Sequence, residues 1–431
     1  MPDLTNETLP KIMNHRFQRL PFEDDQVMPY YEGLSLVNLP STIAQLLDAP
    51  GFTGQPLDRV ITDHLGGPYQ KIVFLLVDAL GYDLFKQMVN PKNGMIWAKY
   101  FDKGVFSPIT SICPSTTASA LTTLWTGAGS GAHGIIGYEM WVKQFGMVIN
   151  NILHSAANTR GDVGGLYRAG FDPAMFMTLP TLGPHLRSYG VSPTTFIHSG
   201  IANSGLSVMQ MRDVNIQTFV NEAELGVNLA EYLNRRSGVR EYIYVYYSDV
   251  DTLMHRYTAD DSRVMLQFSA FSNLFERGFL KNLNKAVADE TLLILTADHG
   301  SIATPLNERF DLANHPQLVS HLVMQPTCEN RLPFMYIKPG RVGQVRDYFA
   351  KIWPDYFYII EPEEALEAGL FGQGPFVGDV LERLGDLIVV TRGDAYLWWS
   401  PRPNPLAGRH GGLHINEMLV PFFALPLGNL N

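Results

Sequence analysis

The chain has 431 residues, of which 46% are hydrophobic, so it can bury a large core in one big α/β domain with an insertion or in two domains. Its 42 acidic and 32 basic residues give a formal net charge of −10. This balance argues against a nucleic-acid polymer as the main partner, because proteins that bind a phosphate backbone concentrate Lys and Arg. Cys113 and Cys328 are too few for a disulfide framework, which favours a reducing compartment.

The N-terminal segment, MPDLTNETLPKIMNHRF, lacks the apolar core of a secretory signal. No later stretch approaches the roughly 18 apolar residues that a membrane-spanning helix requires. We therefore expect a soluble, cytoplasmic protein without a membrane partner. The short amphipathic piece from Ser35 to Leu47 is expected to pack against the main body.

Four apolar runs indicate buried strands, and all of them are rich in β-branched, aromatic or other large apolar residues. They are Lys71 to Val77, Thr194 to His198, Tyr242 to Tyr247 and Leu292 to Thr296. Helical patterns separate these runs: one extends through Met88, and two longer ones cover Ala223 to Arg235 and Ser262 to Leu283. Strands that alternate with helices predict an α/β fold, in which a mostly parallel central sheet is covered by helices on both faces.

The composition of the sequence changes between residues 307 and 405, where prolines, short aromatic-rich runs and turn signals are closely spaced. We interpret 307–405 as an inserted α+β subdomain, and 1–306 together with 406–431 as the main α/β domain. The end of the chain is expected to return as a strand of the main sheet. The aromatic residues of the insertion form either its own core or a roof over a cleft; they are Phe334, Tyr336, Tyr356, Phe357, Trp398 and Trp399.

Acidic and histidine side chains follow three of the predicted strands at the point where each ends. They are Asp78 after the first strand, Asp251 and His255 after the third, and the adjacent pair Asp298 and His299 after the fourth. Ligands of α/β proteins bind in the crevice outside the carboxyl ends of the strands. Carboxylate oxygen and imidazole nitrogen suit zinc or manganese in such a place. Each residue alone also fits a helix cap or a turn, so it is their recurrence that favours a metal site.

Two further features bear on the ligands. Asp251 and His255 are four residues apart, so on a helical turn their side chains lie on one face, close enough to share a metal; Asp249 is interpreted as a turn residue. His410 lies in a Gly-rich segment, and His414 follows four residues later. Either of these histidines could be a ligand, with the other one structural.

The segment SPITSICPSTTASALTTLWTG offers the hydroxyls of Ser115, Thr116, Thr117 and Ser119 at the expected start of a helix. One interpretation is a plain capping cluster. The other is functional, because backbone N–H groups at a helix N-terminus favour a bound anion. A hydroxyl there is placed to attack a phosphorus atom, and coordination to zinc would lower the pKa of that hydroxyl.

Six motifs occur together and in order, and they are LLVDALGYD, CPSTTASALTTLWTG, HGIIGY, DVDTLMH, TADHG and GRHGG. In this order they resemble the alkaline phosphatase superfamily, and within it the type I phosphodiesterase/nucleotide pyrophosphatase family, over Asp78 to Pro421. The resemblance implies an alkaline phosphatase-like fold. It also implies a metal-dependent hydrolase that cleaves phosphodiester or pyrophosphate bonds through a phospho-threonine intermediate at a two-zinc site. Its expected substrate is a small phosphate ester, with nucleotides among the candidates.

The resemblance also assigns residues. One zinc, or manganese as the alternative, would be held by Asp78, Thr117, Asp298 and His299, and the other by Asp251, His255 and His410. Thr117 is the expected nucleophile because it matches the family spacing from Pro114, and Thr116 is the fallback. The chain departs from the family at Tyr138, where the family has an Asn that contacts the phosphoryl oxygens; Asn203 is a candidate replacement without an assigned place.

Three rival functions can be compared with this one. A phosphomonoesterase or phosphonate hydrolase would use the same metals, because pocket residues decide between monoester and diester. A sulfatase would need a Cys-x-Pro-x-Arg pattern, and no Arg follows Cys113 and Pro114 in that way. A catalytically silent binding module normally lacks a ligand or the nucleophile, whereas this chain keeps all seven predicted residues. The oligomeric state is not predictable from the sequence.

Overall fold

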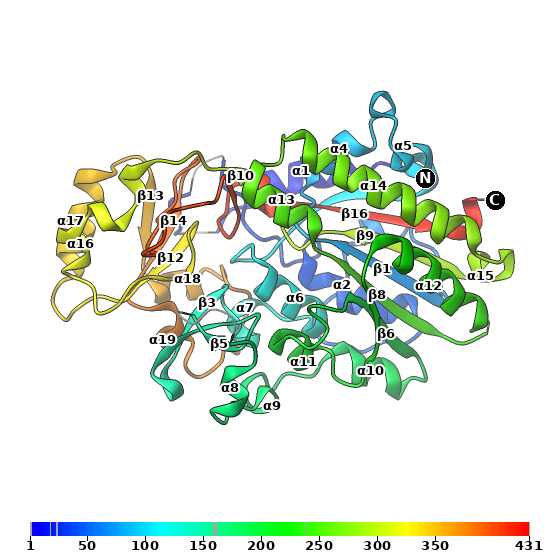
Figure 1. The fold of residues 1–431 in the computed structure, drawn as a ribbon, viewed down its shortest axis with the longest axis horizontal. Helices are drawn as coiled ribbons and strands as arrows, with labels where there is room; N and C mark the ends of the chain where they lie inside the picture. The colour runs from blue at the N-terminus through cyan, green and yellow to red at the C-terminus, as the bar shows by residue number, and fades with distance from the viewer. Residues whose placement is uncertain (1, 18, 23–24, 158–161, 237, 431) are drawn as a thin grey trace.

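A computed structural model describes residues 2–17, 19–22, 25–157, 162–236 and 238–430. Its centre is a seven-stranded sheet in the order β2-β16-β9-β1-β8-β6-β7 (Figure 1). The strands are β1 (Lys71–Val77), β2 (Val105–Thr110), β6 (Ser192–His198), β7 (Asn215–Phe219), β8 (Glu241–Tyr247), β9 (Thr291–Thr296) and β16 (Leu419–Pro426). The four strands expected from apolar runs are confirmed as β1, β6, β8 and β9.

The central strands β9, β1, β8 and β6 run parallel in this sheet, with β7 parallel at one edge. Every residue of β1, β8 and β9 is buried, as expected for strands covered on both faces. The predicted return of the chain end is confirmed as β16, which pairs antiparallel with both β2 and β9. The fold is therefore the predicted α/β class with a mostly parallel sheet.

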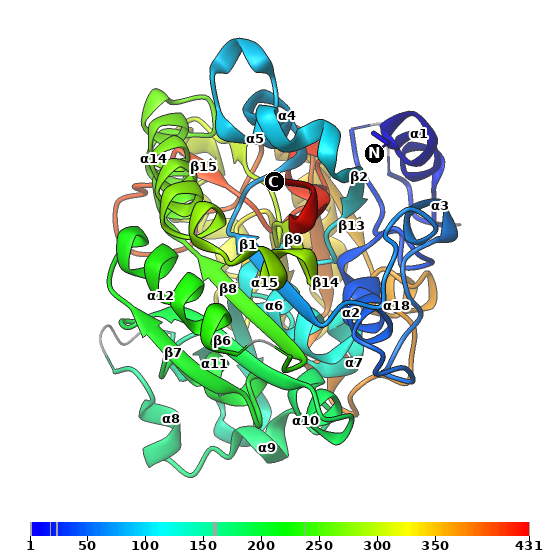
Figure 2. The ribbon, with the colours of Figure 1, turned by 90° about the vertical axis from the view of Figure 1, so that its right-hand side faces the viewer.

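The longer helices are α1 (Thr5–Asn14), α2 (Leu39–Leu46), α6 (Thr117–Thr126), α12 (Glu222–Arg235), α13 (Asp249–Tyr257), α14 (Ser262–Gly278) and α17 (Val342–Ile352). Two aromatic contacts show that helices cover both faces of the sheet (Figures 1 and 2). Trp125 of α6 packs on Tyr244 with ring centroids 5.2 Å apart, whereas Phe271 of α14 stacks on Tyr247 at 4.1 Å. Because successive side chains of a strand point to opposite faces, α6 and α14 lie on opposite sides of β8.

A second seven-stranded sheet has the order β13-β14-β12-β11-β3-β4-β5 and lies on the left in Figure 1. Its strands are β3 (Glu139–Val142), β4 (Met147–Asn150), β5 (Ser155–Ala156), β11 (Thr327–Glu329), β12 (Leu332–Met335), β13 (Phe357–Ile360) and β14 (Leu387–Thr391). The sheet extends beyond the predicted insertion 307–405, since β11 pairs with β3 through Cys328 and Glu139. The division into domains at 307 and 405 stays a prediction.

The second sheet and α17 enclose a small core of their own, which includes Phe310, Trp353 and Phe357. Tyr356, Trp398 and Trp399 pack against this core, while Phe334 and Tyr336 belong to the main one. Four of the six aromatic residues therefore fit the interpretation as the insertion's own core, whereas Phe334 and Tyr336 do not. Among the described residues, none of the helices has the length and apolar character needed to cross a bilayer.

Candidate metal centre

The predicted ligands meet at one edge of the central sheet. Asp78 directly follows β1, and Asp298 follows the neighbouring strand β9. Asp251 lies in the first turn of α13, which begins after β8 on the other side of β1. Because β9, β1 and β8 are parallel, their carboxyl ends and these three carboxylates share one edge, as the sequence predicted.

One group of ligand atoms comprises Asp78, Asp298 and His299, whose atoms lie within 4.8 Å of one another. His299 Nε2 is 3.5 Å from Asp78 Oδ1 and 3.5 Å from Asp298 Oδ2. His299 Nδ1 lies 2.9 Å from the carbonyl oxygen of Gly300. A proton on Nδ1 is donated to that carbonyl, which leaves the lone pair of Nε2 facing the two carboxylates.

Thr117 is the first residue of α6, and its hydroxyl enters this group. Thr117 Oγ1 lies 3.2 Å from His299 Nε2. The hydroxyl of Thr116 is directed elsewhere, because it donates a hydrogen bond of 2.6 Å to Glu329 Oε1. The structure therefore brings Thr117, and not its neighbour, to the predicted ligands.

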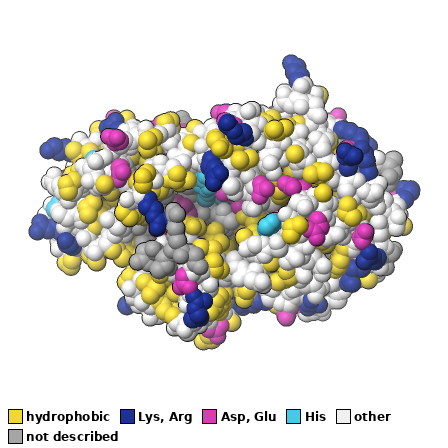
Figure 3. Space-filling view, in the orientation of Figure 1, with side chains coloured by type: hydrophobic (Ala, Val, Ile, Leu, Met, Phe, Trp, Pro, Cys, Tyr) yellow, Lys and Arg dark blue, Asp and Glu magenta, His cyan; other side chains and the backbone are white. Residues whose placement is uncertain are grey.

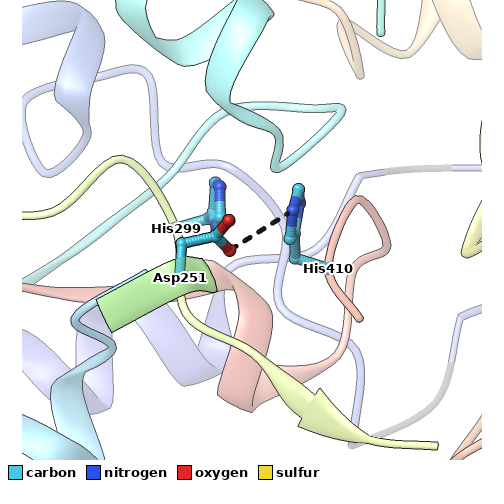
Figure 4. A group of neighbouring side chains, drawn as sticks. All are labelled: Asp251, His299 and His410. Atoms are coloured by element: carbon cyan, nitrogen blue, oxygen red, sulfur yellow. Dashed lines mark ion pairs between the residues drawn. The ribbon is translucent and has the colours of Figure 1, made fainter. Parts of the chain in front are cut away.

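A second group comprises Asp251, His299 and His410 (Figure 4). Asp251 Oδ1 is 3.8 Å from His410 Nε2 and 3.4 Å from His255 Nε2. The Nδ1 atom of His255 lies 3.0 Å from the carbonyl oxygen of Gly408. The Nδ1 atom of His410 lies 3.1 Å from the carbonyl oxygen of Ser115. His299 belongs to both groups, and its ring stacks on that of His410 at 3.7 Å.

The donor atoms fit divalent cations. Three buried carboxylate oxygens of this site have no hydrogen-bond partner in the described structure: Asp78 Oδ1, Asp251 Oδ1 and Asp298 Oδ2. Burial and the neighbouring charges of Asp298 and Asp251 raise the pKa of Asp78 well above its usual range. Burial also raises the pKa of Asp298. Converging buried carboxylates are costly unless a cation compensates them, so the arrangement fits a metal site.

The structure distinguishes the two C-terminal histidines. Burial, with the nearby His299 and His255, lowers the pKa of His410 well below its usual range. With Nδ1 at the carbonyl oxygen of Ser115, the neutral ring leaves the lone pair of Nε2 free for a cation. His414 instead precedes α20 (Ile415–Met418), and its Nδ1 accepts a hydrogen bond of 3.2 Å from the backbone N–H of Asn416. His410 therefore lies with the other predicted ligands, whereas His414 caps a helix.

Two site residues escaped the sequence analysis. The hydroxyl of Tyr246, at the end of β8, donates a hydrogen bond to Asp78 Oδ2. Glu329 comes from the second sheet, and burial raises the pKa of its carboxyl to about 8. Tyr246 was visible only as one residue of an apolar strand, and Glu329 lies outside every motif.

A cavity of about 290 Å³ opens beside the site, and Asp78, Thr117 and Asp251 line one end of it. The face of the molecule in Figure 3 is hollowed near its middle, where His and acidic side chains gather. Tyr138 and Asn203 are not among the described residues that line this cavity. Tyr138 contributes its backbone N–H, which donates to Glu329 Oε1 at 3.0 Å.

Comparisons with known proteins find the same fold in several solved structures. Murine ectonucleotide pyrophosphatase/phosphodiesterase 5 superposes with a TM-score of 0.62 at 16% identity, over 82% of this chain and 88% of that one. The human protein of the same name gives 0.61 at 14% identity, over 82% and 87%. Phosphonoacetate hydrolase from Sinorhizobium meliloti gives 0.57 at 16% identity, over 82% and 89%.

These solved structures share the fold at low identity. A search of curated protein sequences finds no match. Residues 72–413, most of the chain, match the family described as type I phosphodiesterase / nucleotide pyrophosphatase. The chain therefore belongs to this family of the alkaline phosphatase superfamily and is a phosphoric ester hydrolase.

Proposed function

We propose that the protein hydrolyses phosphodiester or pyrophosphate bonds through a phospho-threonine intermediate on Thr117, with two divalent metal ions at the strand ends. The observation that carries the proposal is the position of Thr117 Oγ1, 3.2 Å from His299 Nε2, beside buried carboxylate oxygens that lack partners. A nucleophile among metal ligands is the arrangement that metal-assisted displacement at phosphorus requires.

In this proposal, one ion is held by Asp78, Thr117, Asp298 and His299, and the other by Asp251, His255 and His410. Carboxylate and imidazole ligands favour zinc, with manganese as the alternative. A bound divalent ion supplies Lewis-acid chemistry: it lowers the pKa of a hydroxyl and neutralises charge on phosphoryl oxygens. Because His299 lies in both groups of ligand atoms, its assignment to the first ion rests on the family resemblance.

The chain's own residues account for the bond changes. Thr117 Oγ, after losing its proton, forms a bond to phosphorus while the bond from phosphorus to the leaving oxygen breaks. The leaving oxygen takes up a proton and departs as an alcohol or phosphate. Water then attacks the phospho-threonine, which releases a phosphate monoester and restores the threonine hydroxyl. Backbone N–H groups at the start of α6 are available to the phosphoryl oxygens during both steps.

The substrate is proposed to be a small phosphate ester. The murine neighbour has been solved as an inactive variant with AMP, and the bacterial neighbour with phosphonoformate or phosphonoacetate. The second candidate function is therefore hydrolysis of a phosphonate or phosphomonoester, which the neighbour from Sinorhizobium meliloti favours. A cytoplasmic location remains part of the proposal.

The test compares bis-p-nitrophenyl phosphate with p-nitrophenyl phosphate on protein reconstituted with zinc or manganese. We expect faster turnover of the diester, and loss of turnover in Thr117→Ala but not in Thr116→Ala. Turnover mainly of the monoester would replace the diesterase assignment with the second candidate. Retained activity in Thr117→Ala together with loss in Thr116→Ala would move the nucleophile.

A further inference from the structure

The wall of the cavity beside the metal centre is apolar over most of its extent. Its apolar side chains come from α6, the segment after β4, β6 and the segment around α11 (Gly205–Gln210). They are Leu121, Ile152, Ile197, Ile201, Leu206 and Met211. A ligand that enters from the metal end therefore meets hydrocarbon, which favours an apolar group.

The polar side chains of the wall are largely engaged with each other and with the protein. Ser204 Oγ lies 2.9 Å from Ser207 Oγ, and Ser207 Oγ donates to the carbonyl oxygen of Ile201 at 3.2 Å. Gln210 Nε2 donates to Thr122 Oγ1 at 2.7 Å. These bonds leave few hydrogen-bonding groups of the wall for a ligand.

Tyr244 also lines the cavity, but its hydroxyl offers no hydrogen bond to a ligand. The side chain is fully buried, and the hydroxyl oxygen, which has no hydrogen-bond partner in the described structure, is itself closed off from solvent. A ligand acceptor would have to lie within about 3 Å of that oxygen, and the packing leaves no room for it. The wall therefore presents mainly hydrocarbon to a ligand.

Charge also restricts the ligand. Of the described residues that line the cavity, the charged ones are Asp78 and Asp251, and both lie at the metal end. A second anionic group deep in the cavity would lose its hydration without gaining a cation from these residues. The volume of about 290 Å³ is just below the roughly 300–1,000 Å³ typical of ligand pockets, so the group is small.

From these observations we infer that the cavity binds one organic group of the substrate, and that this group is an uncharged, mainly apolar alkyl or aryl group. The inference rests on the proposed function, since it places the ester phosphorus at Thr117. It names a substrate class, and it disfavours compounds with a second charged group, such as a carboxylate, on the organic side.

The test uses p-nitrophenyl phosphodiesters whose second group is methyl, propyl, butyl, phenyl or carboxymethyl. On metal-reconstituted protein we expect kcat/KM to rise up to about fourfold for each buried methylene, from about 0.8 kcal/mol per CH₂. The carboxymethyl ester should fall at least about tenfold below the propyl ester of similar size. A flat series, or a preference for the carboxymethyl ester, would overturn the inference while leaving the proposed function intact.

Binding gives a readout that does not depend on turnover. The same esters are titrated calorimetrically into metal-loaded Thr117→Ala protein, in which we expect the affinities to follow the same order. If no ester were hydrolysed by the unsubstituted protein, the proposed function would fail, and the order of these affinities would still decide the cavity's preference. Equal affinities across the series would overturn the inference.

Variants locate the binding group within the cavity. Leu206→Ala should lower kcat/KM for the butyl ester about tenfold and leave the methyl ester within about twofold, since only the longer group reaches that wall. Val208→Ala is the matched control, because Val208 lies on the same helix with 50% of its surface exposed and is not among the lining residues. Equal effects of Leu206→Ala and Val208→Ala on the butyl ester would contradict the assignment.

Discussion

The metal-free protein should become more stable when Asp78 is replaced by Asn. Asp78 is 2% exposed, its Oδ1 has no partner, and it shares the site with two other carboxylates. The pKa of its carboxyl is raised by burial and by Asp298 and Asp251, so the folded protein binds this proton more tightly than the unfolded chain does. The stability that the protonated form contributes is therefore present at low pH and is lost as the pH rises through the raised pKa.

An amide of the same shape avoids this loss. Its oxygen can still accept the hydrogen bond from Tyr246, and its NH₂ group can donate to Asp298, with which Asp78 already interacts through its side chain. An unsatisfied buried charged group costs at least about 1–3 kcal/mol, so we expect a gain of about that size in the free energy of unfolding above neutral pH. With an unfolding entropy of about 2.1 cal/mol/K per residue over 431 residues, Tm should rise by only about 1–3 °C.

The assay is thermal and denaturant unfolding of chelator-treated protein over a pH series from about 4, near the ordinary pKa of an aspartate, up to about 8. The difference in unfolding free energy between Asp78→Asn and the unsubstituted protein should be smallest at the low end of this series and should grow as the pH rises. Asp63→Asn is the control, since Asp63 is exposed and lies outside the site. Metal-loaded Asp78→Asn should in contrast be inactive and short of metal by elemental analysis. The reasoning is refuted if metal-free Asp78→Asn is less stable than the unsubstituted protein at the higher pH. It is also refuted if the difference in unfolding free energy between the two proteins does not depend on pH.

Three further predictions concern single side chains. Tyr246→Phe removes the hydrogen bond that orients Asp78, and metal titration should show an affinity about 10–100-fold lower. His410→Ala should bind about one ion fewer per chain by elemental analysis, whereas His414→Ala should keep its metal and lose about 0.5–2 kcal/mol of unfolding free energy with its helix cap. Thr116→Val should reduce turnover far less than Thr117→Ala, because the Thr116 hydroxyl donates its hydrogen bond to Glu329. Equal losses of kcat in the two variants, measured by steady-state kinetics, would count against this.

Much of the fold and site was predictable because both depend on local patterns. A strand that is apolar on both faces, such as β9, implies a covered parallel sheet, and the residue after such a strand must lie at its open edge. The spacing of Asp251 and His255 predicted one helical face, and α13 confirms it. Asp249 was interpreted as a turn residue, and it is instead the first residue of that helix, where an acidic side chain is favourable.

The remaining features depend on contacts between segments that are distant in the sequence. β3 could not be joined to the 307–405 region from periodicity, since only its pairing with β11 reveals the shared sheet. Glu329 reaches Thr116 across more than two hundred residues. His410 and His414 lie only four residues apart in the same segment of the sequence. Only the packing of the chain places His410 among the predicted ligands and His414 at the start of a helix.

The central claim is that Thr117 acts as the nucleophile among two bound ions. The measurement that tests it most directly is the rate of p-nitrophenolate release from bis-p-nitrophenyl phosphate as zinc is added stepwise to metal-free protein. We predict that the rate rises until about two ions are bound per chain, and that Thr117→Ala binds metal but stays inactive. Full activity without metal, saturation at one ion, or unchanged turnover in Thr117→Ala would contradict the claim.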